Sequence, residues 1–142
     1  MEALYNPLLT AHSLLRWLVL VLAVLAVLRA AVGLGRKQPW RPWDDKLGLG
    51  LMVSVDLQVL LGVVLWLHYL GRAGFDMANA ASRQLLLEHP LTMLVALVLV
   101  HVGRVRVKRQ DEDAGRFKTV LVFYGLALVL ILIMIPWDRL GL

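Results

Sequence analysis

Two histidines have the side-chain type and the placement needed to hold an iron porphyrin. His12 and His89 each lie about four residues inside an apolar stretch, which at 1.5 Å of helix rise per residue places both rings roughly 6 Å below one membrane surface. Imidazoles that lie at one depth on two different helices can approach a haem iron from opposite faces. The sequence therefore predicts His12 and His89 as metal ligands, with haem b as the cofactor. The alternative for each ring is that it points into the headgroup region.

Two further side chains complete the predicted cofactor-binding set. Arg16 follows His12 by one helical turn on the same face, where its guanidinium can bind a haem propionate through a charge-assisted bidentate bond. His68 ends the second apolar stretch between two aromatic residues. We interpret His68 as an interfacial residue, or else as a replacement ligand for one of the other two histidines.

A second pair of ionisable residues lies nearer the middle of the membrane. Ionisable groups within a span cost about 3 kcal/mol each on insertion scales, so they tend to be paired or functional. Counting residues along the helices places Asp56 and His101 within a few ångströms of each other in depth. A hydrogen-bonded pair of this kind can bind a quinone carbonyl or carry a proton. The alternative is a purely structural bond between two helices.

Small and polar residues recur at helical spacing on two of the expected spans. Both stripes favour close helix packing, and the second would also admit a flat macrocycle. The stripes are Gly50, Ser54, Gln58, Gly62 and Trp66 on one span, and His89, Met93, Ala96, Val100 and Gly103 on the other. Pro90 lies near the start of the second stripe. It fits either a first helical turn or a kink that leaves the carbonyl of Leu86 in need of another partner.

The elements that must position these residues are transmembrane helices. The chain has 142 residues, of which 60% are hydrophobic, with a mean hydropathy of +0.74. These values exclude an ordinary soluble domain. Four apolar stretches, at about residues 8–34, 47–70, 85–107 and 119–135, each approach the roughly 20 residues that cross a bilayer. We expect an all-α, four-helix membrane bundle that forms a single domain over residues 1–142.

The absence of cysteine narrows the chemistry further. With no cysteine in the chain, disulfides, iron–sulfur ligation and c-type haem attachment are excluded. The sequence also lacks a phosphate loop, a nucleophile elbow and a zinc motif. There is no room for a soluble catalytic domain, and whether the protein is an enzyme stays open.

The basic residues predict an orientation in the membrane. They concentrate in the stretches at residues 29–46 and 104–118, whereas only Arg72, Arg83 and Arg139 flank the opposite side. By the positive-inside rule both basic loops are cytoplasmic and both termini lie outside. The net charge of +5 is then explained by these loops and by contact with anionic lipid. We therefore expect the lipid bilayer as a partner, and no nucleic acid.

Several short motifs together resemble a family of small bacterial four-span proteins described as cytochrome b-like. The motifs are His12-Ser13-Leu14-Leu15-Arg16-Trp17, Asp56-Leu57-Gln58-Val59-Leu60-Leu61-Gly62, Glu88-His89-Pro90, Gly103-Arg104-Val105-Arg106 and Ile135-Pro136-Trp137. The resemblance implies a multi-pass protein of the bacterial inner membrane that binds b-type haem. Related four-helix b cytochromes exchange electrons between the quinone pool and an acceptor. This chain lacks the two histidine pairs on matching faces that larger dihaem cytochromes carry, so no transmembrane electron wire is expected.

Three functional hypotheses follow from the sequence. The leading one is a small b-type cytochrome that transfers electrons through a haem near the outer face and exchanges them with quinone. The alternative is a non-catalytic accessory subunit of a larger respiratory or photosynthetic membrane complex. Ion or solute transport is a third, which Asp56 alone supports weakly because broken helices are missing from the pattern.

Overall fold

The computed structural model describes residues 2–74, 76–135 and 137 and is helical throughout its regular parts. The helices are α1 (Glu2–Gly35), α2 (Pro42–Ala73), α3 (Ala80–Arg83), the π-helical segment η1 (Gln84–Glu88), α4 (His89–Lys108) and α5 (Asp113–Met134). Segments α3, η1 and α4 follow one another without a break, so they form one rod. Four rods are therefore long and apolar enough to cross a membrane. The predicted all-α class and the four spans are confirmed.

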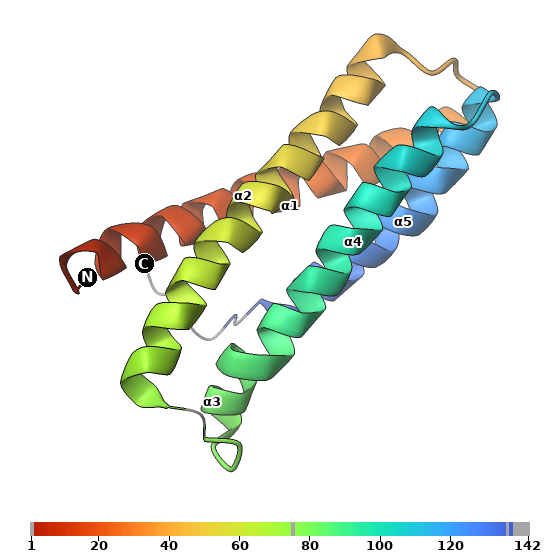
Figure 1. The fold of residues 1–142 in the computed structure, drawn as a ribbon. Helices are drawn as coiled ribbons and strands as arrows, with labels where there is room; N and C mark the ends of the chain where they lie inside the picture. Colours follow the sequence, from red (N-terminus) through yellow and green to blue (C-terminus); the bar gives the residue numbers. More distant parts are fainter. Residues whose placement is uncertain (1, 75, 136, 138–142) are drawn as a thin grey trace.

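The four rods form a bundle in which each packs on two neighbours (Figure 1). Helix α1 contacts α2 and α5, and α4 contacts the same two helices, so α1 and α4 lie diagonally across the bundle. We call the end with the 36–41 and 109–112 connections the basic end. The other end, where α1 starts and α5 finishes, is called the terminal end.

The helices are longer than the apolar stretches predicted. Helix α1 has 34 residues and α2 has 32. At 1.5 Å per residue, α1 is about 50 Å long and exceeds a ~30 Å hydrocarbon core. Helices continue into polar sequence until a residue stops them, whereas hydropathy marks only the apolar part. His12 and His89 consequently lie farther from their helix starts than the sequence suggested. Pro136 of the Ile135-Pro136-Trp137 motif and Arg139, which was counted on the side opposite the basic loops, lie outside the described residues.

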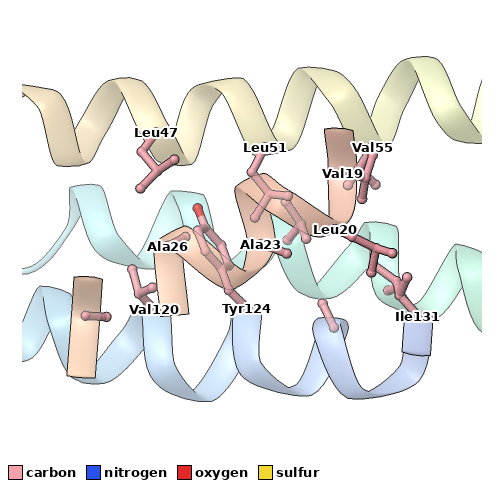
Figure 2. Close-up of a cluster of buried hydrophobic side chains, with 14 of the residues drawn as sticks. Val19, Leu20, Ala23, Ala26, Leu47, Leu51, Val55, Val120, Tyr124 and Ile131 are labelled. Carbon is pink, nitrogen blue, oxygen red and sulfur yellow. The ribbon is translucent and has the colours of Figure 1, made fainter. Parts of the chain in front are cut away.

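The apolar core extends from the basic end past the middle of the bundle, and along α5 it reaches Ile131 (Figure 2). Its largest fully buried side chains come from three helices: Tyr124, Phe117, Leu51, Val100 and Val107. Close helix approach supports this packing, because a Cβ added to Gly103 of α4 would lie 2.7 Å from the Cβ of Phe123 on α5. Glycine at this position therefore lets the two helices touch.

Two ion pairs, of which that of Arg29 with Asp44 is buried, connect α2 to its neighbours at the basic end. Arg29 of α1 donates to the Asp44 carboxylate at 2.8 Å, and that side chain is only 2% exposed. The same carboxylate accepts the backbone N–H of Arg41 at 2.8 Å and so caps α2. Arg104 of α4 donates to Asp45 at 2.8 Å. The basic flanks of the spans thus hold the bundle together as well as carrying charge.

Of the two arrangements considered for Pro90, the structure has the one in which the helix begins before the proline. The rod starts at Ala80, before the proline, and the turn preceding Pro90 widens into the π segment η1. Proline has no N–H for the carbonyl four residues earlier, which is that of Leu86. The indole Nε1 of Trp66 on α2 donates to this carbonyl at 2.9 Å. A side chain of the neighbouring helix thus satisfies the group that the proline leaves open.

Candidate functional site

The half of the bundle nearer the terminal end has few buried apolar residues, among them Leu86, Ile131 and Ile135. Residues 4–18 of α1, 56–72 of α2 and 89–95 of α4 contain no buried side chain. Polar, partly buried side chains lie between these helices: His12, Arg16, Gln58 and His89. We call these four side chains the polar cluster. Unsatisfied polar groups in a membrane interior are costly, so this cluster is the strongest candidate for a functional site.

His12 is held by Gln58 of α2. The side-chain Nε2 of Gln58 donates to the carbonyl oxygen of His12 at 3.0 Å, and lies 3.1 Å from the ring Nε2 of the same residue. A carbonyl only accepts, so the atom facing it is the NH₂ group, which also donates to the ring. The proton of a neutral His12 therefore lies on Nδ1. Gly62 makes room for this ring, since a Cβ there would lie 3.2 Å from Cε1 of His12.

His89 is oriented by a backbone carbonyl of α5. Its Nδ1 lies 3.0 Å from the carbonyl oxygen of Met134, so Nδ1 carries the proton and Nε2 keeps its lone pair. This is the arrangement typical of metal-ligating histidines, whose second nitrogen donates to a carbonyl. The π segment immediately before His89 sets the angle at which the residue enters the bundle, and such segments recur at functional sites.

The polar cluster joins diagonal helices. His12 on α1, His89 on α4 and Arg16 are near enough for the charge of Arg16 to act on both imidazoles. Their joint binding of a haem stays a prediction. Within the described part of the chain, four buried side-chain atoms have no hydrogen-bond partner: His12 Nδ1, Arg16 Nε, Gln58 Oε1 and His68 Nε2. Three of these atoms belong to the polar cluster. Two donors, His12 Nδ1 and Arg16 Nε, and one acceptor, Gln58 Oε1, therefore make no hydrogen bond.

The residues of the polar cluster fit a haem, with one adjustment. His89 offers an oriented Nε2 lone pair, and the buried Arg16 Nε has hydrogen-bonding capacity left for a carboxylate. His12 would ligate through Nε2 only after the Gln58 amide rotates away, which gives up a neutral hydrogen bond worth about 1 kcal/mol. No three His, Cys, Asp or Glu side chains of the described residues gather to hold a bare metal ion. A two-histidine site needs a macrocycle to supply the remaining ligands.

His68 stands apart from the polar cluster. Its ring stacks on Tyr5 of α1 with centroids 4.7 Å apart and an interplanar angle of 25°. This contact supports the interfacial interpretation of His68, because aromatic pairs of this kind pack helix ends together. No described contact brings its ring to His12 or His89, and its role as a replacement ligand stays a prediction.

The pairing of Asp56 with His101 is present in the structure. Nε2 of His101 on α4 lies 3.3 Å from a carboxylate oxygen of Asp56 on α2. Nδ1 of His101 faces the carbonyl of Leu97 at 3.0 Å and must carry a proton. Nε2 and the carboxylate can then attract each other only through one further proton shared between them. Both side chains remain more than two-fifths exposed, so the pair faces the outside of the bundle.

Gln58 is the site residue that the sequence did not reveal. In the sequence it belongs to a stripe of small and polar residues, which signals helix packing alone. Its partner lies 46 residues away, so no local pattern marks the contact. Glu88, the neighbour of His89 in the sequence, forms an ion pair with Arg83 at 3.0 Å. Met134, whose carbonyl performs that role, carries no recognisable signal because any residue supplies a backbone carbonyl.

Comparison with known proteins returned no relative: no family model, no curated protein and no solved structure matches this chain. The interpretation of the polar cluster depends on its geometry.

Proposed function

We propose that the protein is a small b-type cytochrome of the bacterial inner membrane, in which His12 and His89 hold a haem between α1 and α4. The observation that carries this proposal is the polar cluster. Two imidazoles from diagonal helices lie in the half of the bundle that has few buried apolar residues, and the buried Arg16 Nε beside them has no hydrogen-bond partner. A haem would fill space between these helices, and its propionate would accept a hydrogen bond from Arg16.

Each residue of the polar cluster has a distinct role in this proposal. His89 would hold the haem through Nε2, with its ring fixed by the Met134 carbonyl. His12 would hold it through Nε2 after the Gln58 amide turns away, and Gly62 leaves room for its ring. Arg16 would neutralise a propionate. The haem, when bound, supplies one-electron transfer, and two neutral imidazole ligands support that chemistry.

We extend the proposal to the orientation of the bundle and to a redox partner. The positive-inside rule places the basic end in the cytoplasm, and hence the polar cluster toward the outer face. The Asp56 and His101 pair faces outward from the bundle at its middle, where a quinone diffusing in the bilayer has access. An imidazole and a carboxylate are groups that hydrogen-bond to a quinone.

The proposal is tested by the colour of the purified protein. Protein from haem-replete cells, purified in mild detergent, is expected to show a Soret band that shifts on reduction and a sharp alpha band of six-coordinate low-spin haem. His12→Ala and His89→Ala each abolish both bands. His68→Phe is the matched control, since it removes an imidazole, keeps the aromatic stack on Tyr5 and leaves the spectrum unchanged.

A second candidate is the non-catalytic accessory subunit of a larger respiratory or photosynthetic complex. The observation favouring it is that Gln58 already satisfies the Nε2 of His12 without any cofactor. The apolar faces of the helices would then pack on other subunits in addition to lipid. A folded, colourless protein from haem-replete cells supports this candidate and contradicts the cytochrome.

A further inference from the structure

A polar cavity lies at the basic end of the bundle, far along α4 from His89. Its volume is about 300 Å³. It is lined by Trp40, Asp45, Arg104, Val107, Lys108 and Arg116. These residues come from the first connection, α2, α4 and α5, so the fold brings together groups that are well separated in the sequence. The cavity plays no part in the proposed haem site.

The charges around this cavity do not balance. Arg104, Lys108 and Arg116 contribute three cations, and Asp45 is the single carboxylate of the lining. Both oxygens of Asp45 are already engaged, one by Arg104 at 2.8 Å and the other by the indole Nε1 of Trp40 at 3.1 Å. The carboxylate of Asp45 thus holds the wall in place, and Asp113 lies 3.5 Å from Arg116. Three cations face two carboxylates, so one positive charge, that of Lys108, is left over.

The cavity is held open by fixed side chains. Arg104 is 8% exposed in the interior, and Asp45 uses one of its five N–H donors. Nε of Arg116 donates to the carbonyl of Gln110 at 3.0 Å, and its Nη1 lies 3.5 Å from Asp113. Lys108 is exposed and forms no ion pair with the residues that the structure describes. Two anchored guanidinium groups and a free ammonium therefore surround one space.

We infer that this cavity binds a phosphate-bearing anion at the membrane surface. Guanidinium and ammonium donors that converge from three directions suit the several oxygens of a phosphate, and arginine recognises phosphate bidentately. The volume exceeds that of one phosphate group, so part of the attached molecule also fits. Two sources of this chemistry reach the basic end of a bundle: the headgroup of an anionic phospholipid in the adjacent leaflet, and a soluble phosphorylated compound.

The test uses the full chain and a charge-matched pair of variants. Lys108→Gln with Arg116→Gln removes two cations from the cavity and spares the buried Arg104. Arg109→Gln with Lys118→Gln removes two exposed cations from the same end that do not line the cavity. Binding is measured in neutral detergent with inorganic phosphate, and by native mass spectrometry of protein released from nanodiscs of phosphatidylcholine mixed with phosphatidylglycerol.

We expect the wild type to bind at least one probe. The control variant, which lacks Arg109 and Lys118, is expected to bind it equally well. The variant that lacks Lys108 and Arg116 is expected to bind it at least about tenfold more weakly. Retention of phosphatidylglycerol assigns the site to a lipid headgroup, and binding of phosphate alone assigns it to a soluble compound. Equal binding by the two double variants overturns the inference, as does the absence of binding to both probes. Lys108→Gln alone, at a position without structural contacts, provides the same comparison if the double variant fails to fold.

Discussion

At the scale of single residues, the hydrogen-bond partners of three histidines determine which ring nitrogen carries a proton and which keeps a lone pair. Each ring has one nitrogen whose partner fixes the tautomer: Gln58 for His12, the Met134 carbonyl for His89 and the Leu97 carbonyl for His101. Only His89 keeps a lone pair that faces no donor. The structure thus separates three histidines that look alike in the sequence into a ready ligand, a ligand that must first be released, and a member of a proton-sharing pair.

The Asp56 and His101 pair leads to the first prediction. If the two side chains share a proton, their substitution effects on the free energy of unfolding will not add. A cycle of Asp56→Ala, His101→Ala and the double variant is expected to give a coupling free energy of about 0.5–1.5 kcal/mol. The measurement is reversible unfolding in mixed micelles.

Asp56→Asn serves as the conservative variant of that cycle. Its amide donates to the free Nε2 of His101 without any shared proton, so it is expected to keep most of the coupling. Additive effects of the two alanine substitutions would show that the 3.3 Å approach contributes no interaction.

Depth counting along the spans predicted the Asp56 and His101 pair, because this pair depends only on helix rise and on antiparallel order. Depth counting could not predict Gln58 as the partner of His12 or Met134 as the partner of His89. Which face of a helix meets which neighbour depends on rotations about the helix axes, and the packing of all four helices sets these rotations together. The amphipathic pattern of this sequence is weak, so the rotation of each helix cannot be predicted from it.

At the scale of elements, the rod that carries His89 is shaped by Pro90 and by a donor from α2. The sequence showed that the Leu86 carbonyl would need a partner if the helix started before the proline. It did not show that Trp66 is this partner, since a tryptophan near the end of a span equally fits the headgroup zone. The π segment and the indole together fix where α4 begins to face the polar cluster.

Removing the indole donor is therefore expected to destabilise the protein. Trp66→Phe leaves the buried Leu86 carbonyl without its side-chain partner, and the expected loss is about 1–3 kcal/mol in the free energy of unfolding. Trp43→Phe is the matched control, because Trp43 is 51% exposed on the outside of α2. Thermal unfolding in detergent measures both variants. Equal melting temperatures for the two would mean that the Leu86 carbonyl finds another donor.

The contact of α4 with α5 leads to a second prediction at this scale. Gly103→Ala places a Cβ 2.7 Å from the Cβ of Phe123, an atom that moves only if the α5 backbone moves. We expect a loss of about 1–3 kcal/mol from overpacking. Gly125→Ala on α5 meets no atom within 4 Å and is expected to be neutral, or stabilising by up to about 1 kcal/mol through helix propensity. The difference between the two melting temperatures is the readout, and similar values would contradict the close packing.

At the scale of the whole molecule, the bundle divides into two halves with different tasks. The half nearer the basic end has most of the apolar core, the buried pair of Arg29 with Asp44 and the half-exposed pair of Arg104 with Asp45. Breaking a buried pair by removing one partner costs about 3–5 kcal/mol, so the pair of Arg29 with Asp44 makes this half hard to disrupt. The half nearer the terminal end holds the polar cluster and has fewer buried apolar residues. A ligand bound at the polar cluster would therefore stabilise the half of the bundle nearer the terminal end.

The direction in which this bundle crosses the membrane is the last prediction. Because the chain has no cysteine, single-cysteine variants report each connection without background. Arg36→Cys and Asp111→Cys lie at the basic end and Ala78→Cys at the terminal end, and all three positions are exposed. The excess of Lys and Arg near the basic end predicts that a membrane-impermeant maleimide labels only Ala78→Cys in intact spheroplasts, and all three after lysis. Labelling of Arg36→Cys and Asp111→Cys in intact spheroplasts would reverse the orientation and place the polar cluster toward the cytoplasm. Labelling of only one of these two would contradict the four-span topology itself.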